Sequence, residues 1–170
     1  MTTPIQRSAE VFRVHPIILW GAVFASLLLQ AFLPTKIPLT RLFDFPLLTL
    51  IYFAVLRRDK LFAIGLGTAV GLLQDALSHG YIGIFGMAKA IVGYLAASAS
   101  IKFDLDQTLS RSTLTAALVV AHALSLFGLE RILLEPPPPF APLNMASGVL
   151  VNAGLGLILF QLLDQLRKPA

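Results

Sequence analysis

Apolar residues along this chain fall into six blocks, and short polar clusters separate them. The blocks cover residues 17–33, 45–56, 61–77, 81–100, 112–133 and 143–163. A helix needs roughly 20 apolar residues to cross the hydrocarbon core of a bilayer, and five of the blocks come close to that length. The sequence therefore predicts an all-α membrane protein, a bundle of six transmembrane helices.

The second block, residues 45–56, is short for a span because a helix rises only about 1.5 Å per residue. Pro46 stands in its first turn, where a missing N–H is harmless, and the polar cluster at residues 57–60 ends it. We expect this helix to borrow residues 39–43 or to tilt little. Its side chains are bulky and nearly free of polar groups, so we also expect it to face lipid or a partner.

Composition supports the membrane class. Hydrophobic residues make up 56% of the chain and charged residues 13%, with a mean hydropathy of +0.81, whereas ordinary soluble domains carry about 25% charged residues. The absence of cysteine excludes disulfides and thiolate metal sites. The pI near 9.8 does not indicate nucleic-acid binding, because the basic residues form short scattered clusters without interleaved aromatics.

The basic residues instead predict an orientation. Six spans place both termini on one side, which collects nine lysines and arginines, whereas the other side collects three. The nine are Arg7, Arg13, Arg57, Arg58, Lys60, Lys102, Arg111, Arg167 and Lys168, and the three are Lys36, Arg41 and Arg131. Because cytoplasmic loops carry the excess of Lys and Arg, we expect both termini in the cytoplasm.

The predicted organisation has three parts. Residues 1–14 form a cytoplasmic tail, residues 15–166 a single transmembrane domain, and residues 167–170 a second cytoplasmic tail. A signal peptide over the first apolar block is an alternative, but it is disfavoured because no clear small-residue cleavage site follows.

Small residues recur at a spacing of four within residues 65–97, where the third and fourth helices are joined by a turn at residues 78–80. Such spacing lets helix backbones approach closely and gain dispersion energy, which matters where lipid supplies no hydrophobic drive. Similar pairs elsewhere, such as Gly21 and Ala25, favour a compact bundle. The predicted helix-packing glycines are Gly67, Gly71, Gly83, Gly86 and Gly93.

Two charges lie deep inside apolar sequence, Asp75 near the end of the third helix and Lys89 near the start of the fourth. Charges in lipid are costly, and the antiparallel turn brings the two residues within reach of a lysine stem. Either they form an intramembrane pair, or each reaches the outer interface separately. Gln74, His122 and Asn152 are expected to make hydrogen bonds between helices.

Motifs of catalysis are missing from the sequence. It contains no nucleophile elbow, zinc-protease motif or phosphate-binding loop. The three histidines, His15, His79 and His122, fall in three different elements without the spacing of metal ligands. We therefore expect no enzyme activity, no catalytic residue, no metal site and no cofactor.

The segment GLLQDALSHGYIGIFGMAKAIVGYL, preceded by RRDK and a glycine-rich helix, resembles the bacterial rod shape-determining protein MreD family. The pattern is G-x-x-x-G-L-L-x-D, a short turn, and a glycine-bearing helix that ends near G-Y-L. The resemblance is strongest over residues 46–97, and its motifs are moderately specific. The matching positions are Gly67, Gly71, Leu72, Leu73, Asp75, Gly83, Gly93, Tyr94 and Leu95.

This resemblance implies a non-enzymatic scaffold of the bacterial inner membrane, part of the rod complex (elongasome) that maintains cell shape and supports peptidoglycan synthesis. The implied partners are a single-span MreC-like protein, the actin-like MreB, the glycosyltransferase RodA, a class B penicillin-binding protein and membrane lipid, with no nucleic acid.

The family's fold is similar to that of the substrate-binding subunits of energy-coupling-factor vitamin transporters, which are also six-helix bundles. A vitamin-capture subunit is therefore the alternative function. Such a subunit would gather aromatic and hydrogen-bonding side chains at an outer site. The short, proline-rich outer loops of this chain predict no rich site of that kind.

Overall fold

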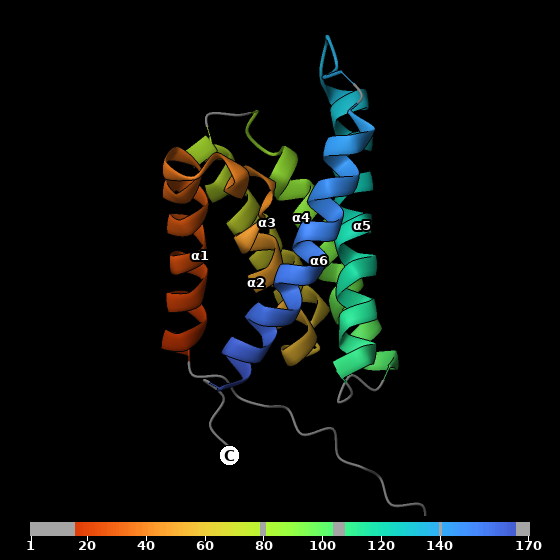
Figure 1. The fold of residues 1–170 in the computed structure, drawn as a ribbon. Coiled ribbons are helices and arrows are strands. Elements are labelled where there is room, and N and C mark those ends of the chain that lie inside the picture. Colours follow the sequence, from red (N-terminus) through yellow and green to blue (C-terminus); the bar gives the residue numbers. More distant parts are fainter. Residues whose placement is uncertain (1–15, 79–80, 104–107, 140, 166–170) are drawn as a thin grey trace, which may run out of the picture.

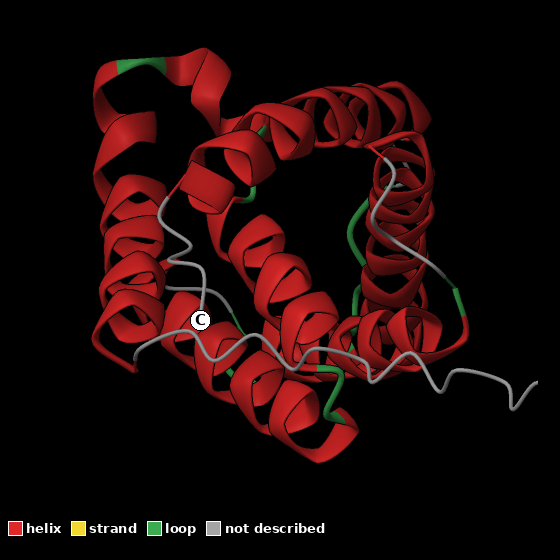
Figure 2. Cartoon of the chain, turned by 90° about the horizontal axis from the view of Figure 1, so that it is seen from below, coloured by secondary structure: helices red, strands yellow, loops and turns green. Residues whose placement is uncertain are grey.

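The computed structural model describes residues 16–78, 81–103, 108–139 and 141–165, and every regular element within these ranges is helical (Figures 1 and 2). Five of the helices are long and apolar enough to cross a membrane, and the sixth, α2, is shorter. The predicted all-α membrane bundle is confirmed. In chain order the elements are α1 (Pro16–Lys36), the 3₁₀ helix η1 (Pro38–Leu42), α2 (Phe45–Arg57), α3 (Lys60–Ser78), α4 (Ile84–Lys102), α5 (Thr108–Leu133) and α6 (Pro142–Gln165).

The short helix α2 is the most enclosed element of the bundle. Every residue from Pro46 to Ala54 is buried, and α2 contacts each of the other five α-helices. The prediction that α2 faces lipid or a partner is therefore wrong. The sequence did not reveal this position, because a helix that is apolar all round suits the centre of a membrane bundle as well as the lipid surface.

The length of α2 shapes the region before it. Thirteen residues rise about 20 Å, whereas the hydrocarbon core is about 30 Å thick, so α2 alone is too short to cross it. Of the two alternatives for this short helix, an extension through residues 39–43 does not occur, because η1 is a separate 3₁₀ helix and Phe43 and Asp44 interrupt the helical structure between η1 and α2. This break leaves backbone N–H and C=O groups that need partners outside a continuous helix.

Helices α3 and α4 lie antiparallel in very close contact. At three glycines an added Cβ would overlap a backbone carbonyl of the facing helix, which real Cβ atoms do not do. Only glycine allows this approach, and the shared surface gains dispersion energy along its length. The contacts are Gly67 on the carbonyl of Lys89, Gly71 on that of Phe85, and Gly93 on that of Ala63.

The other two glycines from the sequence pattern have different surroundings. A Cβ on Gly86 would lie 3.2 Å from the flexible side chain of Leu72, which is a tight contact but one that can adjust. Gly83 precedes α4 with φ 106°, and a Cβ there would meet nothing within 4 Å. Gly83 therefore supplies a left-handed backbone conformation rather than close helix packing.

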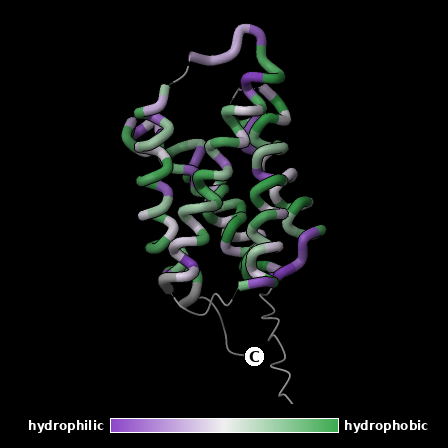
Figure 3. The backbone as a smooth tube through the Cα atoms, turned by 90° about the vertical axis from the view of Figure 1, so that its right-hand side faces the viewer, coloured by the Kyte–Doolittle hydropathy of each residue, from purple (hydrophilic) through white to green (hydrophobic). Residues whose placement is uncertain are grey.

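The start of α1 and the end of α6 lie at the same end of the bundle (Figure 1). The end of α2, the start of α3, the end of α4 and the start of α5 lie at that end too, with Arg57, Lys60 and Lys102 at these helix ends. Hydrophilic positions gather mainly at the two ends of the bundle, and a few lie within it (Figure 3). The predicted tails, residues 1–14 and 167–170, fall outside the described residues.

Candidate functional site

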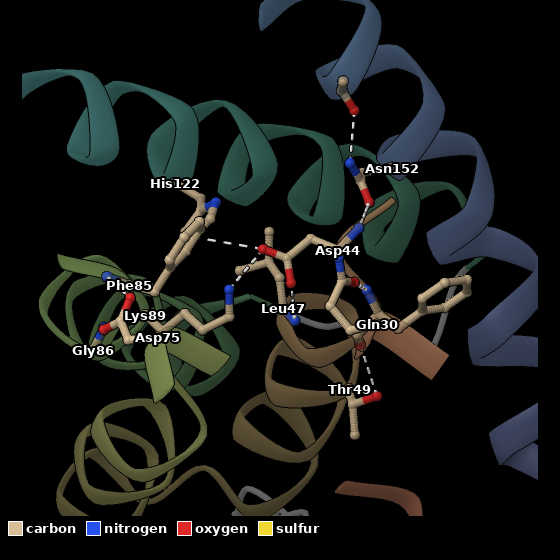
Figure 4. A network of polar contacts seen from close by, with 12 residues as sticks. Gln30, Asp44, Leu47, Thr49, Asp75, Phe85, Gly86, Lys89, His122 and Asn152 are labelled. Atoms are coloured by element: carbon tan, nitrogen blue, oxygen red, sulfur yellow. Dashed lines mark hydrogen bonds and ion pairs between the residues drawn. The ribbon is translucent and has the colours of Figure 1, made fainter. Parts of the chain in front are cut away.

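Asp44, at the break between η1 and α2, joins polar groups from several helices (Figure 4). Its Oδ2 accepts a hydrogen bond from Nζ of Lys89 at 2.6 Å, and its Oδ1 accepts one from the N–H of Leu47 at 3.0 Å. The lysine side chain is 0% exposed and the aspartate side chain 13%. Asp44 is thus both the N-cap of α2 and one half of a buried ion pair.

The backbone at the break is satisfied by side chains from α1 and α6. Asn152 accepts a hydrogen bond from the N–H of Asp44 at 2.7 Å and donates to the carbonyls of Leu42 at 2.7 Å and Gly148 at 2.8 Å. Gln30 accepts from the N–H of Phe45 at 3.2 Å. Because lipid offers no hydrogen bonds, an interrupted helix needs such partners from within the protein.

The ion-pair partner of Lys89 is Asp44, so the first of the two alternatives for Asp75 and Lys89, a pair between them, does not form. The carboxylate of Asp75 instead faces the first turn of α4 (Figure 4). It accepts hydrogen bonds from the N–H groups of Gly83 at 2.8 Å, Phe85 at 3.3 Å and Gly86 at 3.4 Å. The first N–H groups of a helix have no partner within the helix, and an anion is favoured there.

Asp44 is the residue that sequence reasoning missed. It stands in a polar segment with Arg41, which we assigned to a connection between helices. The available signal was local, because an aspartate two positions before Pro46 is a typical N-cap at the start of a helix. Nothing in the sequence indicated that this helix start lies inside the bundle.

The three predicted hydrogen-bonding residues differ in their surroundings. Asn152 bonds to the break between η1 and α2 rather than to another long helix. Gln74 and His122 are each only 5% exposed. Within the described part of the chain, Oε1 of Gln74 and Nε2 of His122 have no hydrogen-bond partner. The His122 nitrogen lies 3.9 Å from Oδ2 of Asp44, which is too far for a hydrogen bond.

A cavity of about 340 Å³ adjoins this cluster. The buried side chains of Gln74 and His122 and the partly buried side chain of Asp44 line its inner part, and Arg41 and Arg131 line it near the end of the bundle that holds η1. The lining includes three aromatic residues, Phe43, Phe85 and Phe127.

The expectation of a poor outer site stays a prediction, and the cavity shows that residues outside the loops also line this end of the bundle. Most of the polar and aromatic lining belongs to η1, α3, α4 and α5 rather than to the proline-rich loop. Among the described residues, no group of three His, Asp or Glu side chains is placed to hold a metal ion.

The sequence pattern of a known family covers this site. A family model described as rod shape-determining protein MreD matches residues 12–134. This chain belongs to the MreD family. The match runs from α1 to the end of α5 and includes Asp44, Asp75, Lys89 and His122, whereas Asn152 lies beyond it.

Family membership and five membrane-length helices make the chain a multi-pass protein of the bacterial inner membrane. The resemblance predicted from the glycine-rich segment is confirmed. No curated protein and no solved structure matches the chain significantly.

Proposed function

We propose that this member of the MreD family is a non-enzymatic scaffold of the bacterial cell-elongation complex. The observation that carries the proposal is the family match over α1 to α5. In this role the chain holds a single-span MreC-like protein and, through the same complex, works with MreB, RodA and a class B penicillin-binding protein. It thereby aligns peptidoglycan synthesis with the cytoskeleton and maintains cell shape.

The burial of α2 limits where a partner helix can bind. Because α2 is enclosed, partners must contact the outer faces of the other helices. Helix α1 lies at the edge of the bundle, where it contacts η1, α2 and α3 among the described elements. Its outward face exposes Trp20, Phe24 and Phe32.

The same helix offers a small-residue pair that packing inside the bundle does not use. Gly21 and Ala25 are both exposed, and a Cβ on Gly21 would meet nothing within 4 Å. A small-residue pair beside large apolar side chains lets a second helix approach closely in lipid. We propose this face of α1 for the single-span partner.

Affinity purification from native membranes, followed by mass spectrometry, tests the proposal. We expect the wild type to recover an MreC-like protein, and depletion of the protein from its rod-shaped host to give rounded cells. Gly21→Leu should reduce recovery of that partner at least several-fold because the larger side chain keeps the helices apart.

Gly65→Leu is the matched control, since Gly65 on α3 is also an exposed helical glycine with open space beside it. If Gly65→Leu loses the partner and Gly21→Leu does not, the partner binds α3 rather than α1. Recovery of an energising ATPase pair, with no cell-wall proteins, would favour the vitamin-capture alternative instead.

A further inference from the structure

We propose that the cavity beside Asp44 binds a small amphiphilic acid. Its apolar body lies among the phenylalanine and leucine side chains of the wall, its single acidic group lies beside Arg41 and Arg131, and a hydrogen-bonding group reaches Gln74 and His122. This site is independent of the scaffold role, because residues of this chain alone form its lining and it requires no partner protein.

The inner part of the cavity holds hydrogen-bonding atoms that the described residues leave unused. Oε1 of Gln74 is an acceptor without a donor, and Nε2 of His122 also lacks a partner. Buried polar atoms without partners are costly, so a site of this kind favours a molecule that completes their hydrogen bonds. A hydroxyl or amide group suits such a site, because it can donate to Gln74 and can also hydrogen-bond with an imidazole.

Part of the cavity wall is apolar. It includes Leu47, Phe85, Val119 and Leu126. The rings of Phe85 and His122 are stacked, with centroids 6.3 Å apart and planes at 27°, which gives the wall a flat face. A volume of about 340 Å³ lies at the lower end of the range of small-molecule pockets. The wall therefore suits a compact apolar group.

The charges around the cavity favour a ligand with one negative charge. Asp44 and Lys89 neutralise each other in the inner part. Arg41 and Arg131 line the cavity with one carboxylate, Glu130, and within the described ranges no ion pair is seen for either arginine. The guanidinium of Arg131 lies 5.3 Å from the ring centroid of Phe127, so the positive charge of Arg131 is next to an aromatic residue of the lining. One positive charge remains for a ligand to neutralise.

A thiol placed in the cavity tests this proposal, because the chain has no cysteine. Ala123→Cys introduces a thiol in the lining, and Ser78→Cys is the control, because Ser78 is exposed at the end of α3 and is not part of the lining. Both variants are placed in nanodiscs of zwitterionic lipid. Their labelling by an anionic and a cationic methanethiosulfonate of similar size is then compared.

We expect the cavity thiol to react several-fold faster with the anionic reagent than with the cationic one, and the control thiol to show no such preference. The probe ligands are 4-phenylbutyrate and 4-phenylbutylamine, which share a body and differ in charge. Phenylbutyrate should slow labelling of the cavity thiol in a saturable manner, whereas the amine should not. Arg41→Gln with Arg131→Gln should abolish both effects, and Glu130→Gln should strengthen them.

Three results would overturn the proposal. Slow, charge-independent labelling without protection by either probe would mean that the cavity holds ordered water alone. If phenylbutyrate still protects the thiol after both arginines are replaced, the acidic group of the ligand does not lie beside Arg41 and Arg131. If anionic phospholipid in the nanodisc blocks labelling by itself, and phenylbutyrate adds nothing in zwitterionic lipid, the occupant is a lipid headgroup rather than a small acid.

Discussion

A carboxylate inside an apolar bundle is costly unless its charge is paired and its oxygens accept hydrogen bonds. Asp44 meets both conditions, because Lys89 neutralises it and the N–H of Leu47 occupies its second oxygen. One residue thus stabilises the start of α2 and provides a counter-ion for a lysine whose side chain is 0% exposed. The two roles respond differently to substitution, because asparagine keeps the cap and loses the charge.

Removal of either charge should be more harmful than removal of both. Asp44→Asn leaves an unpaired ammonium, and Lys89→Met leaves an unpaired carboxylate, and losing one partner of a buried pair costs about 3–5 kcal/mol. The double variant buries no uncompensated charge, so we expect it to be more stable than either single variant. Unfolding of the purified proteins in SDS measures the difference.

The control for this comparison of single and double variants combines Lys89→Met with Asp75→Asn. Asp75 bonds to backbone N–H groups of α4, so its coupling to Lys89 should be much weaker than that of Asp44. Equal coupling for the two aspartates would contradict the assignment of Asp44 as the partner.

The ion pair of Asp44 with Lys89 could not be predicted, because its two residues are far apart in the sequence. Asp44 and Lys89 are separated by 45 positions, whereas Asp75 lies across a short turn from Lys89 and was the obvious local partner. Without knowledge of how α2 packs, the sequence gives no reason to bring the η1–α2 break next to α4. The same reasoning applies to Asn152, which also acts at this break.

At the scale of elements, α3 and α4 form the most closely packed pair. Their glycine spacing was readable from the sequence because helical periodicity is a local property. The position of α2 was not readable, because hydropathy has the same value for a helix in lipid and a helix in the core. Its short length was the one local sign of an unusual position.

Alanine substitutions should have opposite effects at two kinds of glycine. Gly93→Ala places a methyl group against the carbonyl of Ala63, and such overpacking typically costs about 1–3 kcal/mol. Gly65→Ala on α3 meets nothing within 4 Å, so it should stabilise the helix by up to about 1 kcal/mol. The stability of both variants in SDS titrations checks this, and equal effects would refute close backbone contact at Gly93.

At the scale of the whole molecule, the antiparallel helices place Ser78 and Ala141 at one end and Thr108 at the other. The excess of basic residues at the second end predicts that it faces the cytoplasm. Cysteine at position 78 or 141 should therefore react with an impermeant maleimide in intact cells, whereas cysteine at position 108 should react only after lysis. Labelling of position 108 in intact cells would reverse the orientation.

The hydrogen bonds of Asn152 also bear on how the protein is made. The ribosome adds this residue 108 positions after Asp44, when most of the chain has already entered the membrane. Until then the amide of Asp44 and the carbonyl of Leu42 lack their final partner in an apolar environment. The last helix therefore completes the hydrogen bonds at the η1–α2 break, and a chain cut short before α6 leaves the N–H of Asp44 and the carbonyl of Leu42 without these partners.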